Sequence, residues 1–153
     1  MSYIDRNLLP SERIMFRTKR SKILFFYPLV LLVLSIYVTS YMLQNPILAK
    51  VVLAPWIVTG ILFAYAFLEY ATSEYAVTDK RIMMREGFFT RRANEVRLTA
   101  ISQVNVDQTL IGQILNYGTV SINAFGASDA YPLISHPHQF QRTVNQQIDA
   151  LVK

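Results

Sequence analysis

The sequence contains no cysteine, so it forms neither disulfide bonds nor thiolate sites for catalysis or metal binding. Its two histidines, His136 and His138, lie two positions apart at the predicted start of a helix, where their side chains do not converge on a metal ion. The chain also lacks a glycine-rich phosphate-binding loop and a nucleophile–base spacing typical of an enzyme. We therefore predict no catalytic residue, no metal, no cofactor and no small-molecule substrate.

Charge is absent from two long apolar runs. Residues 23–43 and 51–68 contain no Asp, Glu, Lys or Arg, and the break between them includes Asn45-Pro46. A helix that crosses a bilayer core of about 30 Å needs roughly 20 apolar residues, and a soluble helix rarely keeps that length without a polar face. We predict a two-helix transmembrane hairpin over residues 23–70. The alternative is a buried helical hairpin in a soluble core, but too little chain remains to cover two such helices.

Basic residues flank the two runs and almost avoid the link between them. Six lie in residues 1–22, six lie between residues 80 and 97, and Lys50 alone lies in the link. An excess of Lys and Arg marks the cytoplasmic side of membrane proteins. We predict a two-pass protein of a bacterial inner (plasma) membrane with both termini in the cytoplasm. This topology accounts for the net charge of +5 without nucleic acid as a partner.

A second interpretation of the basic residues is recognition of anionic lipid. The candidate headgroup contacts are Arg17, Lys19, Arg20, Lys22, Arg91 and Arg92. Phe88 and Phe89 precede the last two, as in a loop that dips aromatic rings into the headgroups while arginines hold phosphates. The alternative for the phenylalanines is that one or both belong to the core of a sheet.

Beyond residue 70 the apolar residues alternate with polar ones, which is typical of strands. We predict strands over residues 73–78, 81–86, 90–98, 101–107, 117–125 and 130–135, with one helical turn or a bent loop at 109–115. Gly87 suits a turn that needs a positive φ. Alternation in the fourth of these strands places Ile101, Gln103, Asn105 and Asp107 on one face and Val104 and Val106 on the other.

The two ends of the chain carry further patterns. Residues 14–18 alternate and predict a short strand that adds to the later sheet, although Pro10-Ser11-Glu12 also resembles a helix start. Pro137 suits the first position of a final helix, whose apolar stripe is Phe140, Val144, Ile148 and Leu151. Short antiparallel strands closed by one amphipathic helix predict a small β-sandwich or barrel with a helical cap.

The order of several motifs resembles the bacterial pleckstrin-homology (PH) domain family in its membrane-anchored YdbS-like form. The matching stretches are Leu9-Pro10-Ser11-Glu12-Arg13, SEYAVTDKRIMMREG at 73–87, Glu95, Leu98, Ile101, Val104, Gln108, NYGTVSI at 116–122, His136-Pro137 and Phe140. The family commonly has Asn-Pro where this chain has His136-Pro137. The resemblance implies a PH-like fold of about seven strands capped by a C-terminal α-helix.

These observations predict three segments: a cytoplasmic basic arm at 1–22, the transmembrane hairpin at 23–70 and a cytoplasmic PH-like domain at 71–153. The leading hypothesis for function is a non-enzymatic membrane-anchored binding or scaffold protein. Its expected partners are the lipid bilayer and either a protein partner or a second copy in a homo-oligomer, bound through an exposed strand edge. The alternatives are an accessory subunit of a membrane transport or channel assembly and a sensor of anionic lipid headgroups.

Overall fold

The structure is a computed structural model that describes residues 3–88 and 91–152. Contacts divide the chain into two compact units. One, which we call the hairpin, is Lys22–Ala71. The other, which we call the β domain, contains the described residues up to Ser21 and from Thr72 onward. The residues before the hairpin therefore belong to the same unit as those after it, rather than forming a separate arm.

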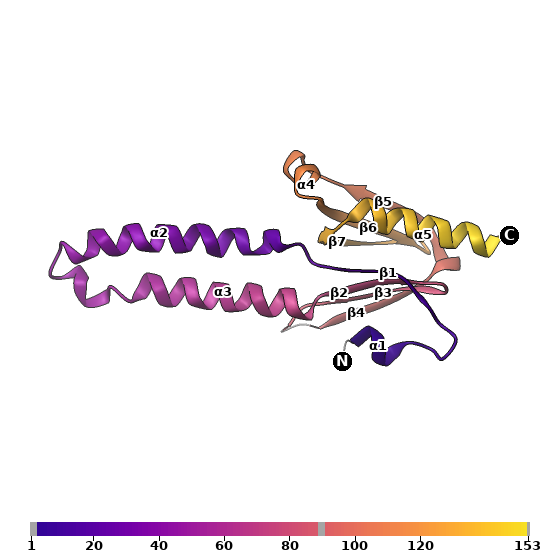
Figure 1. Ribbon diagram of the computed structural model, residues 1–153, viewed down its shortest axis with the longest axis horizontal. Helices are drawn as coiled ribbons and strands as arrows, with labels where there is room; N and C mark the ends of the chain where they lie inside the picture. The colour runs from indigo at the N-terminus through magenta and orange to yellow at the C-terminus, as the bar shows by residue number, and fades with distance from the viewer. Residues whose placement is uncertain (1–2, 89–90, 153) are drawn as a thin grey trace. The chain divides into compact units, whose positions relative to one another are not determined.

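The chain begins and ends with a helix, and the hairpin is inserted among the strands between them (Figure 1). In order they are α1 (Tyr3–Asn7), β1 (Ile14–Lys19), the 3-10 turn η1 (Lys22–Phe25), α2 (Phe26–Leu43), η2 (Leu48–Val51), α3 (Ala54–Thr72), β2 (Glu74–Thr78), β3 (Arg81–Glu86), β4 (Arg92–Arg97), η3 (Leu98–Ala100), β5 (Ile101–Asp107), α4 (Leu110–Ile114), β6 (Tyr117–Ala124), β7 (Ala127–Ser135) and α5 (Pro137–Val152).

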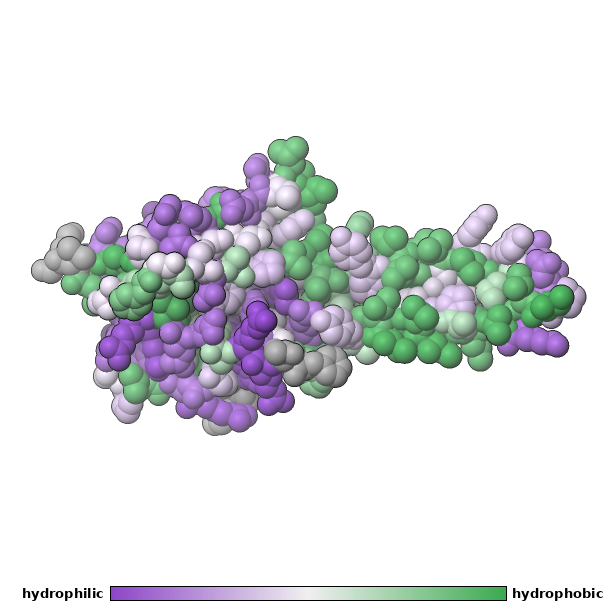
Figure 2. All heavy atoms as spheres, turned by 180° about the vertical axis from the view of Figure 1, so that it is seen from behind, coloured by the Kyte–Doolittle hydropathy of each residue, from purple (hydrophilic) through white to green (hydrophobic). Residues whose placement is uncertain are grey.

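The hairpin consists of two helical segments, Lys22–Leu43 and Leu48–Thr72, each long and apolar enough to span a membrane. Both are strongly apolar, yet only 11% of the apolar stretch in each is buried within the protein. Figure 2 shows apolar residues over most of its surface. A soluble core helix would bury this surface against other protein. The composition and exposure of the hairpin therefore suit a lipid environment.

Hydroxyl groups join the two helices of the hairpin. Ser35 Oγ and Thr59 Oγ1 are 2.8 Å apart, and Trp56 Nε1 donates to Thr39 Oγ1 at 2.9 Å. Ser35 and Thr59 are both buried within an otherwise apolar pair of helices. In an apolar medium such interhelical hydrogen bonds satisfy groups that would otherwise lack partners. Gly60 takes no part, because nothing lies within 4 Å of the position a Cβ would occupy.

The β domain contains seven antiparallel strands, counted over the described residues, in two sheets. The first has the order β1-β2-β3-β4 and the second β5-β6-β7. Because β1 and β2 are neighbours in the first sheet, the whole hairpin is an insertion between two hydrogen-bonded strands. The predicted strand at 14–18 is confirmed. The predicted fold, a PH-like sandwich of about seven strands capped by a C-terminal helix, is confirmed as well.

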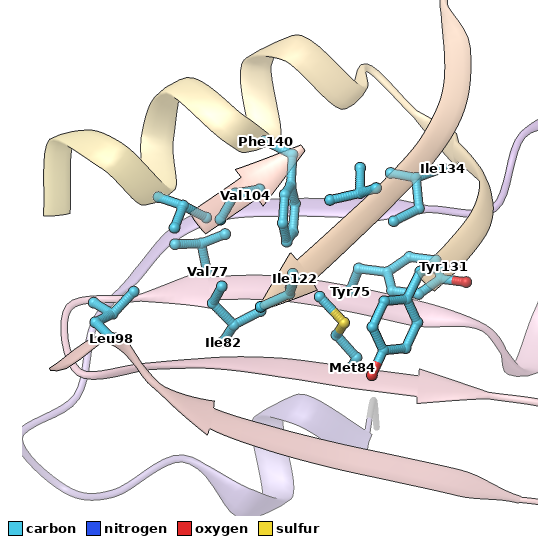
Figure 3. Close-up of a cluster of buried hydrophobic side chains, with 12 residues drawn as sticks. Tyr75, Val77, Ile82, Met84, Leu98, Val104, Ile122, Tyr131, Ile134 and Phe140 are labelled. Carbon is cyan, nitrogen blue, oxygen red and sulfur yellow. The ribbon is translucent and has the colours of Figure 1, made fainter. Parts of the chain in front are cut away.

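The core lies between the two sheets and the face of α5 (Figure 3). Its twelve buried residues are Tyr75, Val77, Ile82, Met84, Leu98, Val104, Val120, Ile122, Tyr131, Ile134, Phe140 and Val144. Phe140 and Val144 come from the predicted stripe of the final helix, and Ile148 packs against the same cluster. Leu151 does not follow them, since 49% of it is exposed. Three turns of amphipathic helix are thus enough to close the sandwich.

A second, smaller cluster lies on the other face of the first sheet. Ile4 of α1 is fully buried against Ala76 and Met83, and Tyr3 packs beside them. The Arg85 guanidinium lies 4.7 Å from the centre of the Tyr3 ring, which favours a cation–π contact. The residues at the start of the chain, expected to be a basic arm, therefore cover one face of the sheet.

The prediction for the faces of β5 was wrong at Ile101. The ladder between β5 and β6 shifts register between Ile101 and Gln103, which is a β-bulge. A bulge adds one residue to one strand and reverses the alternation beyond it. Ile101 therefore packs against the main core together with Val104 and Val106. Gln103 points away from it and is exposed.

The insertion generates a prediction about autonomous folding. Residues 72–153 alone lack β1, α1 and Glu12, so they should not unfold cooperatively. A chain that joins residues 1–21 to 72–153 through a Gly/Ser linker of about four residues should fold without detergent, because Lys19 and Glu74 are directly paired. Thermal unfolding by circular dichroism checks both chains. Equal midpoints for the two would show that β1 is dispensable.

Candidate functional site

The register of the first sheet gives the β domain two distinct ends. Lys19, the last residue of β1, pairs with Glu74, the first of β2. Glu86, the last of β3, pairs with Arg92, the first of β4. Two residues separate β1 from the hairpin and one separates α3 from β2. Both links to the hairpin therefore leave from this end, which we call the tether end.

The second sheet contributes to the same end. Arg20 forms a β-bridge with Ile134, just before the end of β7. Ser135, the last residue of β7, also accepts a 2.8 Å hydrogen bond from Thr18 and lies opposite Tyr117, the first residue of β6. The β5–β6 connection, which contains α4, therefore lies at the tether end as well.

The tether end brings together most of the predicted headgroup contacts. Lys19 is exposed and Arg20 is half-buried where the chain leaves β1. Arg91 and Arg92 are exposed where it enters β4. Lys22, also exposed, is the first residue of the hairpin. Segments more than 70 residues apart in the sequence thus place basic side chains at one end of the domain.

Arg17, the remaining predicted headgroup contact, lies among acidic side chains of the β domain. Its Nη1 is 3.4 Å from Asp5 Oδ1, and its Nη2 is 3.8 Å from Glu74 Oε2. Such partly exposed pairs each contribute less than about 1 kcal/mol. They nevertheless link α1, β1 and β2, so the geometry supports a structural role for this residue.

The two candidate membrane-dipping phenylalanines follow β3. Phe88 is 37% exposed and is not a member of the main core cluster. Gly87 before it has φ +81°, as the predicted turn requires. Phe89 lies outside the described residues. The partial exposure of Phe88 at the tether end does not support the alternative that places it in the sheet core.

The apolar face of α4 was not predicted from the sequence. Leu110, Ile111, Ile114 and Leu115 are all exposed. The signal was present as two apolar pairs spaced by four residues, which is one face of a helix. Leu and Ile are among the residues most often buried, so their exposure was not apparent from the pattern alone.

At the opposite end of the first sheet, Glu12 makes a group of interactions with Thr78 and Arg81 that we call the clasp. Arg81 Nε and Nη2 donate to the two carboxylate oxygens of Glu12, each at 3.0 Å. Thr78 Oγ1 lies 2.7 Å from Glu12 Oε1, and the Leu9 amide donates to Oε2 at 3.1 Å. Arg81 also pairs with Glu95 of β4. The clasp therefore ties the chain before β1 to the β2–β3 turn.

The clasp perturbs the ionisation of its members. Burial alone would raise the pKa of Glu12, but hydrogen bonds from Arg81, Thr78 and Leu9 outweigh it and lower the pKa to about 2. The hydrogen bond to Glu12 in turn raises the pKa of Arg81. Two of the motifs that carried the family resemblance, LPSER and VTDKR, thus meet here, where Glu12, Thr78 and Arg81 stabilise the fold.

A small polar cavity of about 50 Å³ lies between β3, β4 and β7. Asn94 Nδ2 donates to Tyr131 Oη at 2.8 Å and to Asp129 Oδ2 at 3.4 Å across it. Burial raises the pKa of Tyr131, and the nearby negative charge of Asp129 raises it further. The hydrogen bond from Asn94 lowers this pKa but does not outweigh burial. A space of this size suits a water molecule rather than a substrate.

Across residues 3–88 and 91–152, no three His, Asp or Glu side chains are grouped to hold a metal.

This two-sheet sandwich with a C-terminal helical cap is a PH-like fold, and PH domains are generally non-catalytic interaction modules. The chain belongs to the bacterial PH domain family, whose model matches residues 23–148. The match includes the hairpin from Ile23 onward and the strands β2 to β7. Comparison with curated proteins and with solved structures gave no match.

The clasp predicts a specific acid sensitivity. A folded-state pKa of about 2, below the ordinary 4.5, stabilises the fold above pH 4.5, and this stabilisation is lost as the pH falls towards 2. Glu12→Gln should lower the free energy of unfolding at pH 7 by up to about 3 kcal/mol. Plotted against pH, the unfolding free energies of the wild-type and variant chains should converge near pH 2. Urea unfolding of the joined soluble chain described above, between pH 2 and 7, measures this.

Glu95→Gln is the matched control, because Glu95 pairs with the same arginine but its side chain is 35% exposed. It should cost less than about 1 kcal/mol. Equal losses for the two variants would contradict a special role for Glu12.

Proposed function

We propose that this protein is a non-enzymatic membrane-anchored binding or scaffold protein. The hairpin crosses a bacterial inner membrane twice and holds the β domain in the cytoplasm, where both termini lie. The observation that supports this best is the insertion of the hairpin between the paired strands β1 and β2. An anchor attached at one terminus leaves a domain free to rotate. Two short links from neighbouring strands restrict that rotation and keep one end towards the membrane.

Such an anchor removes the need for strong lipid affinity in the domain itself. Tethering raises the effective concentration of the domain at the membrane, and weak contacts then suffice for binding there. The rest of the surface is left for a partner. This arrangement suits a scaffold, and it agrees with the membrane-anchored YdbS-like form of the family that the sequence resembles.

The edge strand β4 is the surface that suits a protein partner. It ends the first sheet, with β3 on its paired side, and its residues Arg92, Ala93, Glu95 and Arg97 are exposed. The edge of β5 differs, because Gln141 of α5 donates to the Val104 carbonyl at 2.7 Å. An open edge binds an extended segment through backbone hydrogen bonds. The partner is either another protein or a second copy of this chain.

A role in sensing anionic lipid is a second candidate. It is favoured by the gathering of Lys19, Arg91 and Arg92 at the tether end. The remaining alternative, an accessory subunit of a transport assembly, has less support. The hydroxyls of Ser35 and Thr59 hydrogen-bond each other instead of lining a path.

Membrane topology is tested with the full chain in bacterial cells. A fluorescent protein that matures only in the cytoplasm, fused after Lys153, should be bright, and alkaline phosphatase fused there should be inactive. The protein should sediment with membranes and resist extraction by carbonate, because two apolar helices hold it in the lipid. Recovery in the soluble fraction, or an active phosphatase, would contradict the anchor.

Partner binding at β4 is tested by photo-crosslinking in intact membranes. A crosslinking amino acid in place of Ala93 should give a species heavier than the monomer, because an added strand would lie beside it. The matched control replaces Gln139, which is exposed on α5. Only monomer at position 93, or equal crosslinking at both positions, would argue against recognition through this edge.

A further inference from the structure

The helix α4 carries an exposed apolar surface, which we call the α4 patch. Leu110 is 80% exposed, Ile111 60%, Ile114 83% and Leu115 53%. Single exposed apolar residues are common, but a contiguous group on a small domain marks an interaction surface. Figure 2 shows an apolar projection from the β domain where α4 lies. The patch requires a partner that can cover aliphatic side chains.

The local structure holds the patch in place. Thr109 caps the helix, its hydroxyl accepting a 3.1 Å hydrogen bond from the Gly112 amide. A Cβ at Gly112 would lie 2.6 Å from the Tyr117 carbonyl oxygen. Only glycine at this position therefore allows the helix to pack so closely against β6. Gln108 Nε2 donates to that same carbonyl at 2.9 Å. These contacts turn Gly112, the buried residue of α4, towards β6 and leave the aliphatic side chains outside.

The position of the patch identifies its partner. The β5–β6 connection lies at the tether end, from which both links to the hairpin leave. The shorter link is the single residue Ser73, and one extended residue spans no more than about 3.6 Å. If the hairpin spans a bilayer, the tether end must lie close to its surface. Lys19, Arg91 and Arg92 at this end are exposed and complement an anionic leaflet.

We propose that the α4 patch inserts into the interfacial region of the lipid bilayer and forms a third attachment of the β domain to the membrane. This proposal rests on the membrane-anchored function proposed above. The aliphatic side chains of Leu110, Ile111, Ile114 and Leu115 enter the boundary between headgroups and acyl chains, as those of interfacial helices do. The basic residues contact phosphates beside them. The domain is thereby fixed in one orientation, with β4 available to a partner.

The absence of native cysteine makes a direct test simple. The full chain carrying Ile114→Cys, labelled with an environment-sensitive fluorophore, is reconstituted in vesicles of phosphatidylethanolamine and phosphatidylglycerol. Its emission should shift to shorter wavelength, and lipids with nitroxides on the acyl chains should quench it roughly twofold or more. Leu110→Cys provides a second label and should behave alike. Because both residues are exposed, neither change disturbs the core.

Phe125→Cys is the matched control. Phe125 is 91% exposed and lies in the β6–β7 turn, at the end of the second sheet opposite the tether end. Its label should be quenched by aqueous iodide and not by lipid nitroxides. Labels at 110 and 114 that behave like the label at 125 would overturn the proposal. Labels at 110 and 114 shielded from both quenchers would also overturn it, because a protein surface would then cover the patch.

Val58→Cys separates this inference from the proposed function. Val58 lies in α3 and is 55% exposed. Lipid nitroxides should quench a label there whenever the hairpin is in the bilayer. Quenching at 58 without quenching at 110 and 114 would reject membrane insertion of α4 and keep the anchor. The absence of quenching at 58 would reject the anchor itself, and with it the role proposed for α4.

Discussion

Pairing of β1 with β2 is the interaction on which the rest of the structure depends. The two strands are separated in sequence by the whole hairpin, so their pairing closes a loop of more than 50 residues. Closing such a loop carries an entropic cost that grows with its length. The hairpin reduces this cost because its two helices are joined through Ser35 and Thr59, and Phe25 and Tyr70 are in contact near the ends that lead to β1 and β2. At the opposite end of the sheet, the contact between Glu12 and Arg81 holds the first strand in place.

This arrangement explains why the most recognisable residues of the chain are structural. Thr78 and Arg81 belong to one of the motifs that carry the family resemblance, and both hydrogen-bond Glu12. Fold and function are separable in such a domain. The surfaces that remain for function are those that the core does not use: an open strand edge at β4, basic residues at the tether end and the apolar face of α4. None of these is defined by a motif.

The two kinds of surface suit different partners. Aliphatic side chains beside Lys and Arg match the interfacial layer of an anionic membrane, where burial and charge both favour contact. The charged, exposed edge of β4 would be unfavourable in lipid, but it offers backbone groups to another strand. The two surfaces share only Arg92, the first residue of β4, so contact with the membrane and binding of a partner need not compete. In the proposed arrangement, attachment at two or three points would present the free edge of β4 in a constant direction.

The sequence by itself determined the elements whose signals are local. Apolar runs predicted the hairpin, alternation predicted β3 and β5 with their observed ends, and Pro137 marked the start of the last helix. Tertiary structure alone decided which distant elements meet, such as Glu12 with Arg81, α1 with the sheet and α4 with the tether end. It also decided the bulge at Ile101 and the exposure of Ile114. The spacing of apolar residues depends only on the local sequence, so it predicts helices and strands. Strand pairing and exposure depend on which distant segments the topology brings beside a residue, and local spacing carries no information on that.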